Sequence, residues 1–151
     1  MSTNYYLLTK NRSIAEKIGD FELTDTPDWG YLIHIGKRSC GWLPLFQSHR
    51  GIKSVKDIEE WCKLPEITIL DEYDKVLTWK QLKEELINWN GGVEGKVEKQ
   101  YHEVNLNSSF FYDSDMPNYT PVSHFDYGNG KYSSRYFKDA EGYEFTTDEF
   151  C

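Results

Sequence analysis

Cysteine is scarce in this 151-residue chain, and long apolar runs and a basic leader are missing. The three cysteines, Cys40, Cys62 and Cys151, are an odd number at long spacings, which favours reduced thiols over a disulfide framework. No apolar run approaches the ~20 residues that cross a bilayer, so we expect no membrane association. Residues 1–10 lack a basic start followed by an apolar core, which predicts no secretory signal. Together these absences predict a cytoplasmic protein.

Positive charge is also in short supply. Seventeen Lys and Arg residues face 25 Asp and Glu residues, and the formal net charge is −8. A net-acidic chain repels phosphate backbones, so non-specific binding to DNA or RNA is not expected. The acidity is concentrated after residue 63, because residues 1–63 hold nine basic and eight acidic side chains (+1), whereas residues 64–151 hold eight and 17 (−9).

Aromatic side chains, in contrast, are abundant, at 16% of the chain. Thirteen of the 24 Phe, Trp and Tyr residues lie in the last 51 positions, together with nine acidic residues and three basic ones. Acidic groups interleaved with tyrosines can present a negative, stackable surface to a basic partner. The candidate contact residues are Tyr136, Asp139, Glu141 and Tyr143. The alternative is that these tyrosines build strands and fill a core with their hydroxyl groups in water.

Length and hydrophobic patterning predict a single domain, residues 1–151, of the α+β class. Helices are predicted where capping-box spacings or an apolar stripe occur, at 14–18, 55–63 and 79–89. Strands are predicted for the β-rich runs at 4–9, 31–35, 42–47, 66–70, 76–77, 124–127, 131–137 and 143–145. Residues 93–120 show little periodicity and are expected to form an irregular insertion or a mobile loop.

These elements predict a mainly antiparallel sheet with two main helices, 55–63 and 79–89, packed on one face. The sheet would contain the N-terminal strand, the hairpin over residues 31–47 and the C-terminal meander. The apolar stripe of the second helix consists of Trp79, Leu82, Leu86 and Trp89. The tryptophans expected in the core are Trp42, Trp61, Trp79 and Trp89.

The densest polar cluster is the segment 34–42, HIGKRSCGW. Glycines allow positive φ values and inward-facing amides at both ends of its turn. Charge and a hydroxyl group come from His34, Lys37, Arg38 and Ser39. The segment therefore predicts an anion site for a nucleotide or a phosphate, and the alternative is an exposed basic hairpin turn. It is not a P-loop, because Tyr31 stands where a Walker A motif requires glycine.

The sequence gives less support to a metal site or a reactive thiol than to the anion site. The histidines and cysteines form no C-x-x-C, H-x-x-x-H or H-x-H pair, so we expect neither a metal site nor another cofactor. Cys40 stands beside Lys37 and Arg38, which would favour its thiolate form and a nucleophilic role. The alternative, a packing cysteine, is more common, and Cys62 on an apolar helix face is expected to be a core residue. No catalytic residue is assigned.

Four short motifs stand in order along the chain: YYL at 5–7, HIGK with GW at 34–42, DEY at 71–73 and DAEGYEF at 139–145. In this order they resemble a family of small, largely uncharacterised bacteriophage proteins. The resemblance covers most of the chain, with residues 93–120 the least familiar part. It implies a phage product made in the cytoplasm of the host bacterial cell, as an accessory protein and not a capsid subunit.

Small acidic phage proteins are often inhibitors of host nucleases or defence complexes. The resemblance thus implies a non-catalytic accessory protein that binds and inhibits or modulates a host protein, expected to handle nucleic acid or serve defence. Two alternatives stay open. One is a protein that binds a nucleotide or phosphate at Lys37, Arg38 and Ser39. The other is a small enzyme that acts on a phosphate-containing substrate through Cys40 or His34.

Overall fold

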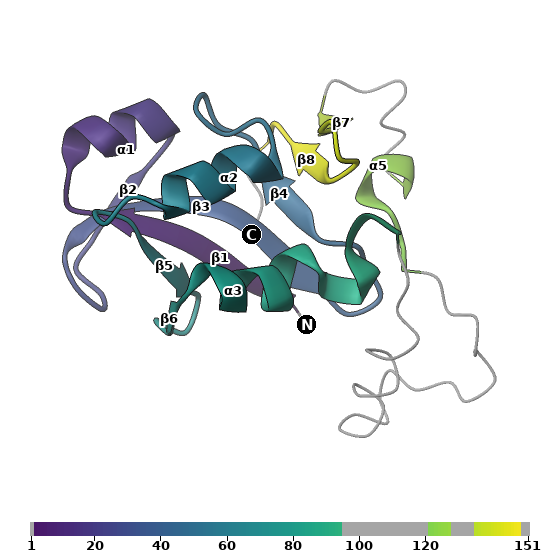
Figure 1. Ribbon diagram of the computed structural model, residues 1–151, viewed down its shortest axis with the longest axis horizontal. Helices are drawn as coiled ribbons and strands as arrows, with labels where there is room; N and C mark the ends of the chain where they lie inside the picture. The colour runs from purple at the N-terminus through teal and green to yellow at the C-terminus, as the bar shows by residue number, and fades with distance from the viewer. Residues whose placement is uncertain (1, 95–120, 128–134, 149–151) are drawn as a thin grey trace.

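The computed structural model describes residues 2–94, 121–127 and 135–148 (Figure 1). Its strands are β1 (Ser2–Thr9), β2 (Glu22–Thr24), β3 (Gly30–Ser39), β4 (Leu45–Gln47), β5 (Thr68–Asp71), β6 (Val76–Leu77), β7 (Tyr136–Lys138) and β8 (Glu144–Thr146). Its helices are α1 (Arg12–Ile18), α2 (Val55–Cys62), α3 (Trp79–Leu82) and α5 (His124–Tyr127), with a π-helical turn η1 (Lys83–Ile87) and a 3-10 segment η2 (Trp89–Glu94). Within these described ranges, no helix is long and apolar enough to cross a membrane.

The eight described strands form one sheet in the order β6-β5-β1-β3-β4-β8-β7, with β2 paired to β3 beside this path. β1 runs antiparallel to both of its neighbours, β3 and β5. β2 and β4 pair with opposite ends of the long strand β3. The pairing of β4 with β8 is parallel, and the other pairings between described strands are antiparallel. The sheet is therefore mainly antiparallel, as predicted.

One face of the sheet carries the hydrophobic core. Successive strand residues point to opposite faces, and Tyr5, Leu7, Ile33 and Ile35 are fully buried on the core face. The helices α1, α2 and α3 and the turn η1 lie over this face (Figure 1). Burial of each aliphatic side chain in this layer contributes ~1.5–3 kcal/mol. The α+β class and the packing of the two main helices on one face are confirmed.

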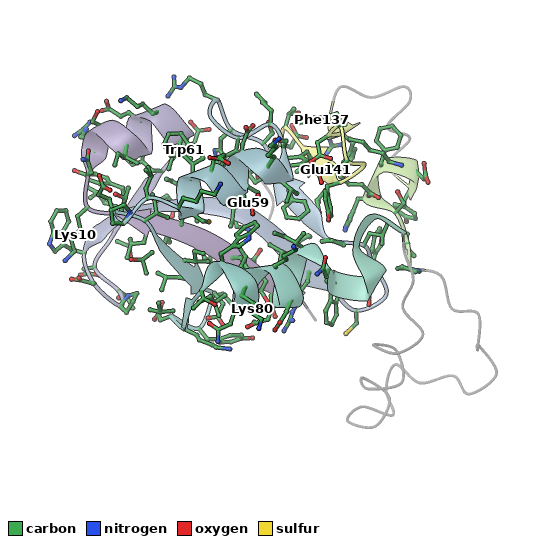
Figure 2. The ribbon with its side chains drawn as sticks, in the orientation of Figure 1. Lys10, Glu59, Trp61, Lys80, Phe137 and Glu141 are labelled. Carbon is green, nitrogen blue, oxygen red and sulfur yellow. The ribbon has the colours of Figure 1, made fainter. Side chains whose placement is uncertain are left out.

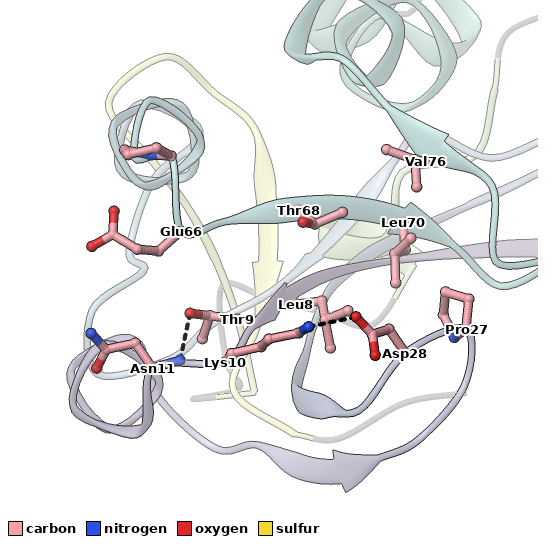
Figure 3. Close-up of a pocket in the computed structure, with 11 residues that line it drawn as sticks. Leu8, Thr9, Lys10, Asn11, Pro27, Asp28, Glu66, Thr68, Leu70 and Val76 are labelled. Atoms are coloured by element: carbon pink, nitrogen blue, oxygen red, sulfur yellow. Dashed lines mark hydrogen bonds and ion pairs between the residues drawn. The ribbon is translucent and has the colours of Figure 1, made fainter.

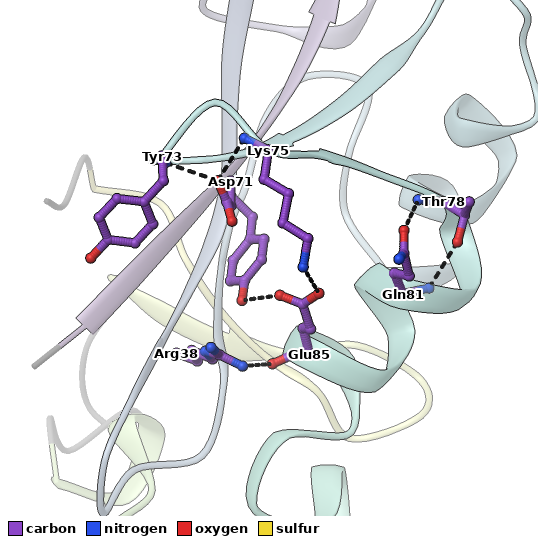
Figure 4. Close-up of polar contacts among 8 residues, drawn as sticks. Arg38, Asp71, Tyr73, Lys75, Thr78, Gln81 and Glu85 are labelled. Atoms are coloured by element: carbon purple, nitrogen blue, oxygen red, sulfur yellow. Dashed lines mark hydrogen bonds and ion pairs between the residues drawn. The ribbon is translucent and has the colours of Figure 1, made fainter.

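The helix predicted for residues 79–89 begins as expected and is divided into α3 and η1. Thr78 Oγ1 accepts the backbone N–H of Gln81 at 3.1 Å, and Gln81 Oε1 accepts the N–H of Thr78 at 2.9 Å (Figure 4). This capping box satisfies two backbone donors that the first turn leaves without partners. Leu82 and Leu86 are fully buried, as the apolar stripe predicts.

The four tryptophans expected in the core lie at its margin instead. All four are half-buried: Trp42, Trp61, Trp79 and Trp89. Trp61 (Figure 2) and Trp89 donate their indole Nε1–H to the backbone carbonyls of Gly51 and Ser39, both at 2.9 Å. An indole N–H needs a hydrogen-bond partner, which draws tryptophan to the border of an apolar core.

The predicted hairpin over residues 31–47 has a different turn. Lys37–Ser39 continue β3, so the predicted loop is reduced to a short turn at Cys40 and Gly41. Gly41 takes a positive φ of 86°, a conformation that favours glycine. The second strand is shorter than predicted, because β4 begins only at Leu45, after Pro44. The alternative of an exposed basic hairpin turn is therefore wrong, because Lys37–Ser39 are half-buried residues of β3.

The C-terminal meander also departs from prediction. Residues 124–127 form the short helix α5 instead of a strand. The carboxylate of Glu144 accepts the N–H of Phe125 and the hydroxyl of Ser123, both at 2.9 Å, and so holds the first turn of α5. The predicted strand 131–137 is seen as β7, and residues 131–134 lie outside the described part of the chain. So does most of the predicted insertion 93–120.

Candidate functional site

The sheet face opposite the core carries polar side chains of β1, β3 and β4. A pocket of about 540 Å³ opens there, which is within the usual size range of small-ligand sites. Its lining residues include Tyr6, Asp20, Glu22, His34, Gln47 and His49. We call it the histidine pocket. Two carboxylates, and no Lys or Arg, line it among the described residues.

His49 is held between β2 and β4, which pair with opposite ends of β3. Its Nε2–H donates to the His34 carbonyl of β3 at 2.6 Å, and its Nδ1 accepts the backbone N–H of Asp20 at 3.3 Å. These two partners require the neutral Nε2–H tautomer. The ring also needs glycine at position 19, because a Cβ on Gly19 would lie 2.3 Å from the His49 Cβ. His49 thus links β3 to the end of α1 and shapes the pocket.

His34 forms a wall of the pocket. Its Nε2 lies 3.0 Å from Asn4 Oδ1 and 3.1 Å from the Gly36 carbonyl, and as an N–H it donates to both. The centre of the Tyr6 ring lies 5.1 Å from that of the imidazole. Burial lowers the pKa of His34 to about 4, because the charged imidazolium would lose its hydration. The ring is therefore neutral at pH 7 and adds no positive charge to the pocket.

Gln47 contributes a hydrogen-bond acceptor, its Oε1, to which no described residue donates. The residue is only 5% exposed, and its Nε2 donates to the carbonyls of Ser48 at 3.3 Å and Thr146 at 3.4 Å. These two acceptors set the orientation of the amide. Its Oε1 is buried and has no hydrogen-bond partner among the described residues. Such an unsatisfied buried group costs ~1–3 kcal/mol, which a ligand with a hydrogen-bond donor would recover.

The segment between α1 and β2 brings negative charge to the pocket. Asp20 and Glu22 are both exposed and line it. Phe21 stands between them in the chain, also lines the pocket and packs edge-on against Tyr31, with ring centres 5.1 Å apart. Exposed carboxylates next to aromatic rings suit a cationic or donor-rich group.

The predicted anion site is not assembled. Lys37 and Arg38 are neighbours in β3 and therefore point to opposite faces. The Arg38 guanidinium lies 4.6 Å from the centre of the Trp89 ring and donates to the Glu85 carbonyl at 3.1 Å (Figure 4). The register of β1 and β3 shifts at a β-bulge between His34 and Gly36, so Lys37, opposite Asn4, lies on the pocket face, where its charge acts on His34. The structure does not bring these two cations together around one ligand.

The remaining residues of that cluster lie at the end of β3. The Ser39 carbonyl accepts the Trp89 indole N–H, and Cys40 is a half-buried free thiol in the turn that follows. Cys62 is half-buried on α2 against the core, and burial raises the pKa of its thiol to about 12. Cys62 therefore stays protonated at neutral pH, as fits a packing residue.

The predicted acidic and aromatic surface is divided between the fold and solvent. Asp139 Oδ2 accepts the N–H of Val55 at 2.9 Å, at the start of α2, and Oδ1 accepts the N–H groups of Glu141 and Tyr143 at 3.0 and 2.8 Å. Tyr143 packs half-buried against the core. Asp139 and Tyr143 therefore serve the fold. Glu141 is exposed (Figure 2) and Tyr136 is half-buried.

A second hollow, of about 770 Å³, lies on the pocket face toward β5 (Figure 3). Leu8 and Leu70 are among its apolar lining residues. Lys10 and Asp28 line it as well, and their charges pair at 2.6 Å. Lys10 also lies 5.7 Å from the centre of the Trp29 ring. These two charges pair with each other, so Glu66 is the remaining charged side chain among the described residues that line this hollow, against two carboxylates in the histidine pocket.

Sequence reasoning identified His34 and missed its neighbours in the pocket, among them Asp20, Glu22, Gln47 and His49. Alternation along residues 45–47 could have placed Gln47 opposite the buried Phe46. No local pattern joins His49 to Asp20, which lies 29 positions away.

Among the described residues, no group of three His, Cys, Asp or Glu side chains is placed to hold a metal ion. Comparison with known proteins found no matching protein family, no similar curated protein and no similar solved structure.

Proposed function

We propose that this chain is a bacteriophage accessory protein that binds a host protein in the bacterial cytoplasm, and that the histidine pocket is its contact site. The supporting observation is the pair of exposed carboxylates, Asp20 and Glu22, in a pocket also lined by the rings of Tyr6 and Phe21. This combination suits a basic partner, because opposite charges speed association and buried aromatic anchors contribute most to affinity. The resemblance to phage proteins supplies the host context.

We still propose a basic partner, as predicted from the acidic C-terminal segment, but we place its contact site in the histidine pocket. Asp139 accepts three backbone N–H groups within the fold, so its carboxylate is committed there. Asp20 and Glu22 carry exposed carboxylates. An anionic ligand has less support, because these two carboxylates would repel it and Arg38 is engaged by Trp89.

Charge reversal tests the proposal. The variant Asp20→Lys/Glu22→Lys should recover the host protein from a lysate of the host bacterium at least about tenfold less well than wild type. The matched control Glu59→Lys/Glu84→Lys makes the same charge change on α2 (Figure 2) and η1, over the other face, and should bind as wild type does. Circular dichroism verifies that both variants are folded.

The dependence of binding on salt concentration is a second test, since exposed interfacial charges are screened as ionic strength rises. The wild-type complex should weaken with added salt, and the pocket variant should lose that dependence. Equal recovery by the two double variants would show that the histidine pocket is not the contact site.

A further inference from the structure

We propose that the histidine pocket takes a guanidinium group, so that the host partner presents an arginine side chain to it; this inference rests on the proposed function. A guanidinium is planar, carries five N–H donors in that plane and is less strongly hydrated than an ammonium. It can therefore stack on an aromatic ring while donating to several acceptors at its edge. The pocket has both kinds of surface.

The acceptors come from two sides of the pocket. Asp20 and Glu22 contribute charged oxygens beside β2, and Gln47 contributes its unsatisfied Oε1 from β4. That oxygen is buried in the unbound protein, so the Gln47 side chain turns toward the pocket to accept from the ligand. The turn breaks only two long hydrogen bonds, at 3.3 and 3.4 Å, and it satisfies an acceptor that has no donor within the described chain.

Aromatic surface lies next to these acceptors. Tyr6, Phe21 and His34 all line the pocket. The Tyr6 and His34 rings lie against each other, tilted by 38°, so their remaining faces and edges bound the cavity. A cation over such rings gains ~0.5–2 kcal/mol, and guanidinium groups stack on them more often than ammonium groups do.

The chain itself holds cations in this way elsewhere. Arg38 lies 4.6 Å from the centre of the Trp89 ring and 5.9 Å from that of Tyr5, and it donates to the Glu85 carbonyl. The Arg38 site and the histidine pocket both combine hydrogen-bond acceptors with aromatic rings from other parts of the chain. The difference is that, among its described lining residues, the histidine pocket has rings and acceptors without a guanidinium or an ammonium.

Two lysines lie near the pocket without lining it. Lys53 Nζ donates to Ser48 Oγ at 3.2 Å, and Lys37, opposite Leu45 in the sheet, acts on His34. Both charges oppose a bound cation, so its attraction depends on Asp20 and Glu22, which line the pocket itself.

Small probes test the inference without the host partner. The full chain, labelled with 13C and 15N, is titrated at pH 7 and low salt with N-acetyl-argininamide, and the Tyr6 and His34 ring signals are followed by NMR. N-acetyl-citrullinamide is the matched neutral probe, with the same shape and no charge, and N-acetyl-lysinamide is the ammonium probe. We expect saturable shifts at these rings with the arginine probe, and at least about tenfold weaker binding of both controls.

Two matched variants assign any binding to the pocket. Asp20→Asn/Glu22→Gln should weaken binding of the arginine probe at least about fivefold, and Glu59→Gln/Glu84→Gln should leave it unchanged. The inference is overturned if the citrulline probe binds as well as the arginine probe, or if the arginine probe shifts signals only outside the pocket. If the arginine probe does not bind but host-protein capture still depends on Asp20 and Glu22, the guanidinium inference fails and the proposed function stands. If the arginine probe binds in the pocket and no host protein is captured, the pocket takes a guanidinium and the proposed function fails.

Discussion

The two faces of β3 use their polar groups in opposite ways. On the helix-covered face, Glu85 accepts from Tyr5, Lys75 and Arg38, at 3.3, 3.2 and 3.1 Å, the last through its carbonyl (Figure 4). On the pocket face, Gln47 Oε1 has no donor within the described residues. The first face is closed by a layer of helices whose polar groups satisfy one another. The second has an acceptor without a donor and two exposed carboxylates, Asp20 and Glu22.

The two faces therefore differ in which polar groups are available to a ligand. Polar groups that satisfy one another contribute to stability, whereas a buried group left unsatisfied lowers stability and points to a ligand. Substitutions on the helix-covered face should therefore change the free energy of unfolding. Substitutions on the pocket face should change binding and the response to acid.

The largest expected effect is on the helix-covered face. Leu82→Ala and Leu86→Ala should each lower the free energy of unfolding by about 2–5 kcal/mol, because each removes a fully buried side chain and leaves a cavity. Urea denaturation followed by tryptophan fluorescence measures this. Lys83→Ala, on the exposed side of the same helix, is the control and should cost less than about 0.5 kcal/mol. Leucine variants as stable as the control would show that this layer does not hold the fold together.

Acid should act through two half-buried imidazoles, His34 on the pocket face and His124 in α5. Burial lowers the pKa values of His34 and His124 from 6.5 to about 4. The unfolded chain therefore takes up these protons at higher pH than the folded chain, so their contribution to stability is full above pH 6.5 and is lost as pH falls toward 4. At about 1.4 kcal/mol per pKa unit, His34 alone accounts for a loss of about 3 kcal/mol.

Urea unfolding at pH 7, 5.5 and 4 measures this loss. His34→Gln keeps an N–H donor for Asn4 and the Gly36 carbonyl but does not titrate, so its stability should fall less over the same range. Parallel curves for the variant and the wild type would assign the acid response to other groups.

Arg38 and Lys37, neighbours in β3, allow the stability contributions of the two faces to be compared directly. Arg38→Ala removes the contact with Trp89 and the hydrogen bond to the Glu85 carbonyl, and should cost about 1–3 kcal/mol. Lys37→Ala, one position away on the other face, should cost about 0.5 kcal/mol. Thermal unfolding of the two variants side by side is sufficient. A larger loss for Lys37→Ala would reverse the assignment of the two faces.

The smallest expected effect on stability is at Gln47. Gln47→Leu removes the unsatisfied oxygen, which stabilises the fold, and two long hydrogen bonds of Nε2, which destabilises it, and it keeps the volume. The free energy of unfolding should therefore stay within about 1 kcal/mol of wild type. Binding of N-acetyl-argininamide should nevertheless weaken, since a pocket acceptor is lost. A variant that is strongly destabilised, or that binds the probe as wild type does, would show that Gln47 serves the fold alone.

The sequence predicted the fold better than the site, for a physical reason. The capping box at Thr78 and the buried stripe of Leu82 and Leu86 follow from spacings within one helix, and both are confirmed. Of the predicted site residues, His34 lines the histidine pocket, whereas Arg38 and Asp139 are engaged within the fold. Polar residues look alike in a sequence whether they hold a turn together or face a ligand.

By itself, the sequence determined the class of the fold, because strand and helix periodicities, caps and turns act over a few neighbouring residues. Only the tertiary structure decided which polar groups are used up internally. It brings His49 to Asp20, Ser39 to Trp89 and Gln47 to Thr146, across 29, 50 and 99 positions of the chain. Such long-range pairs depend on how the sheet is ordered and covered, and the same side chains would suit many other arrangements.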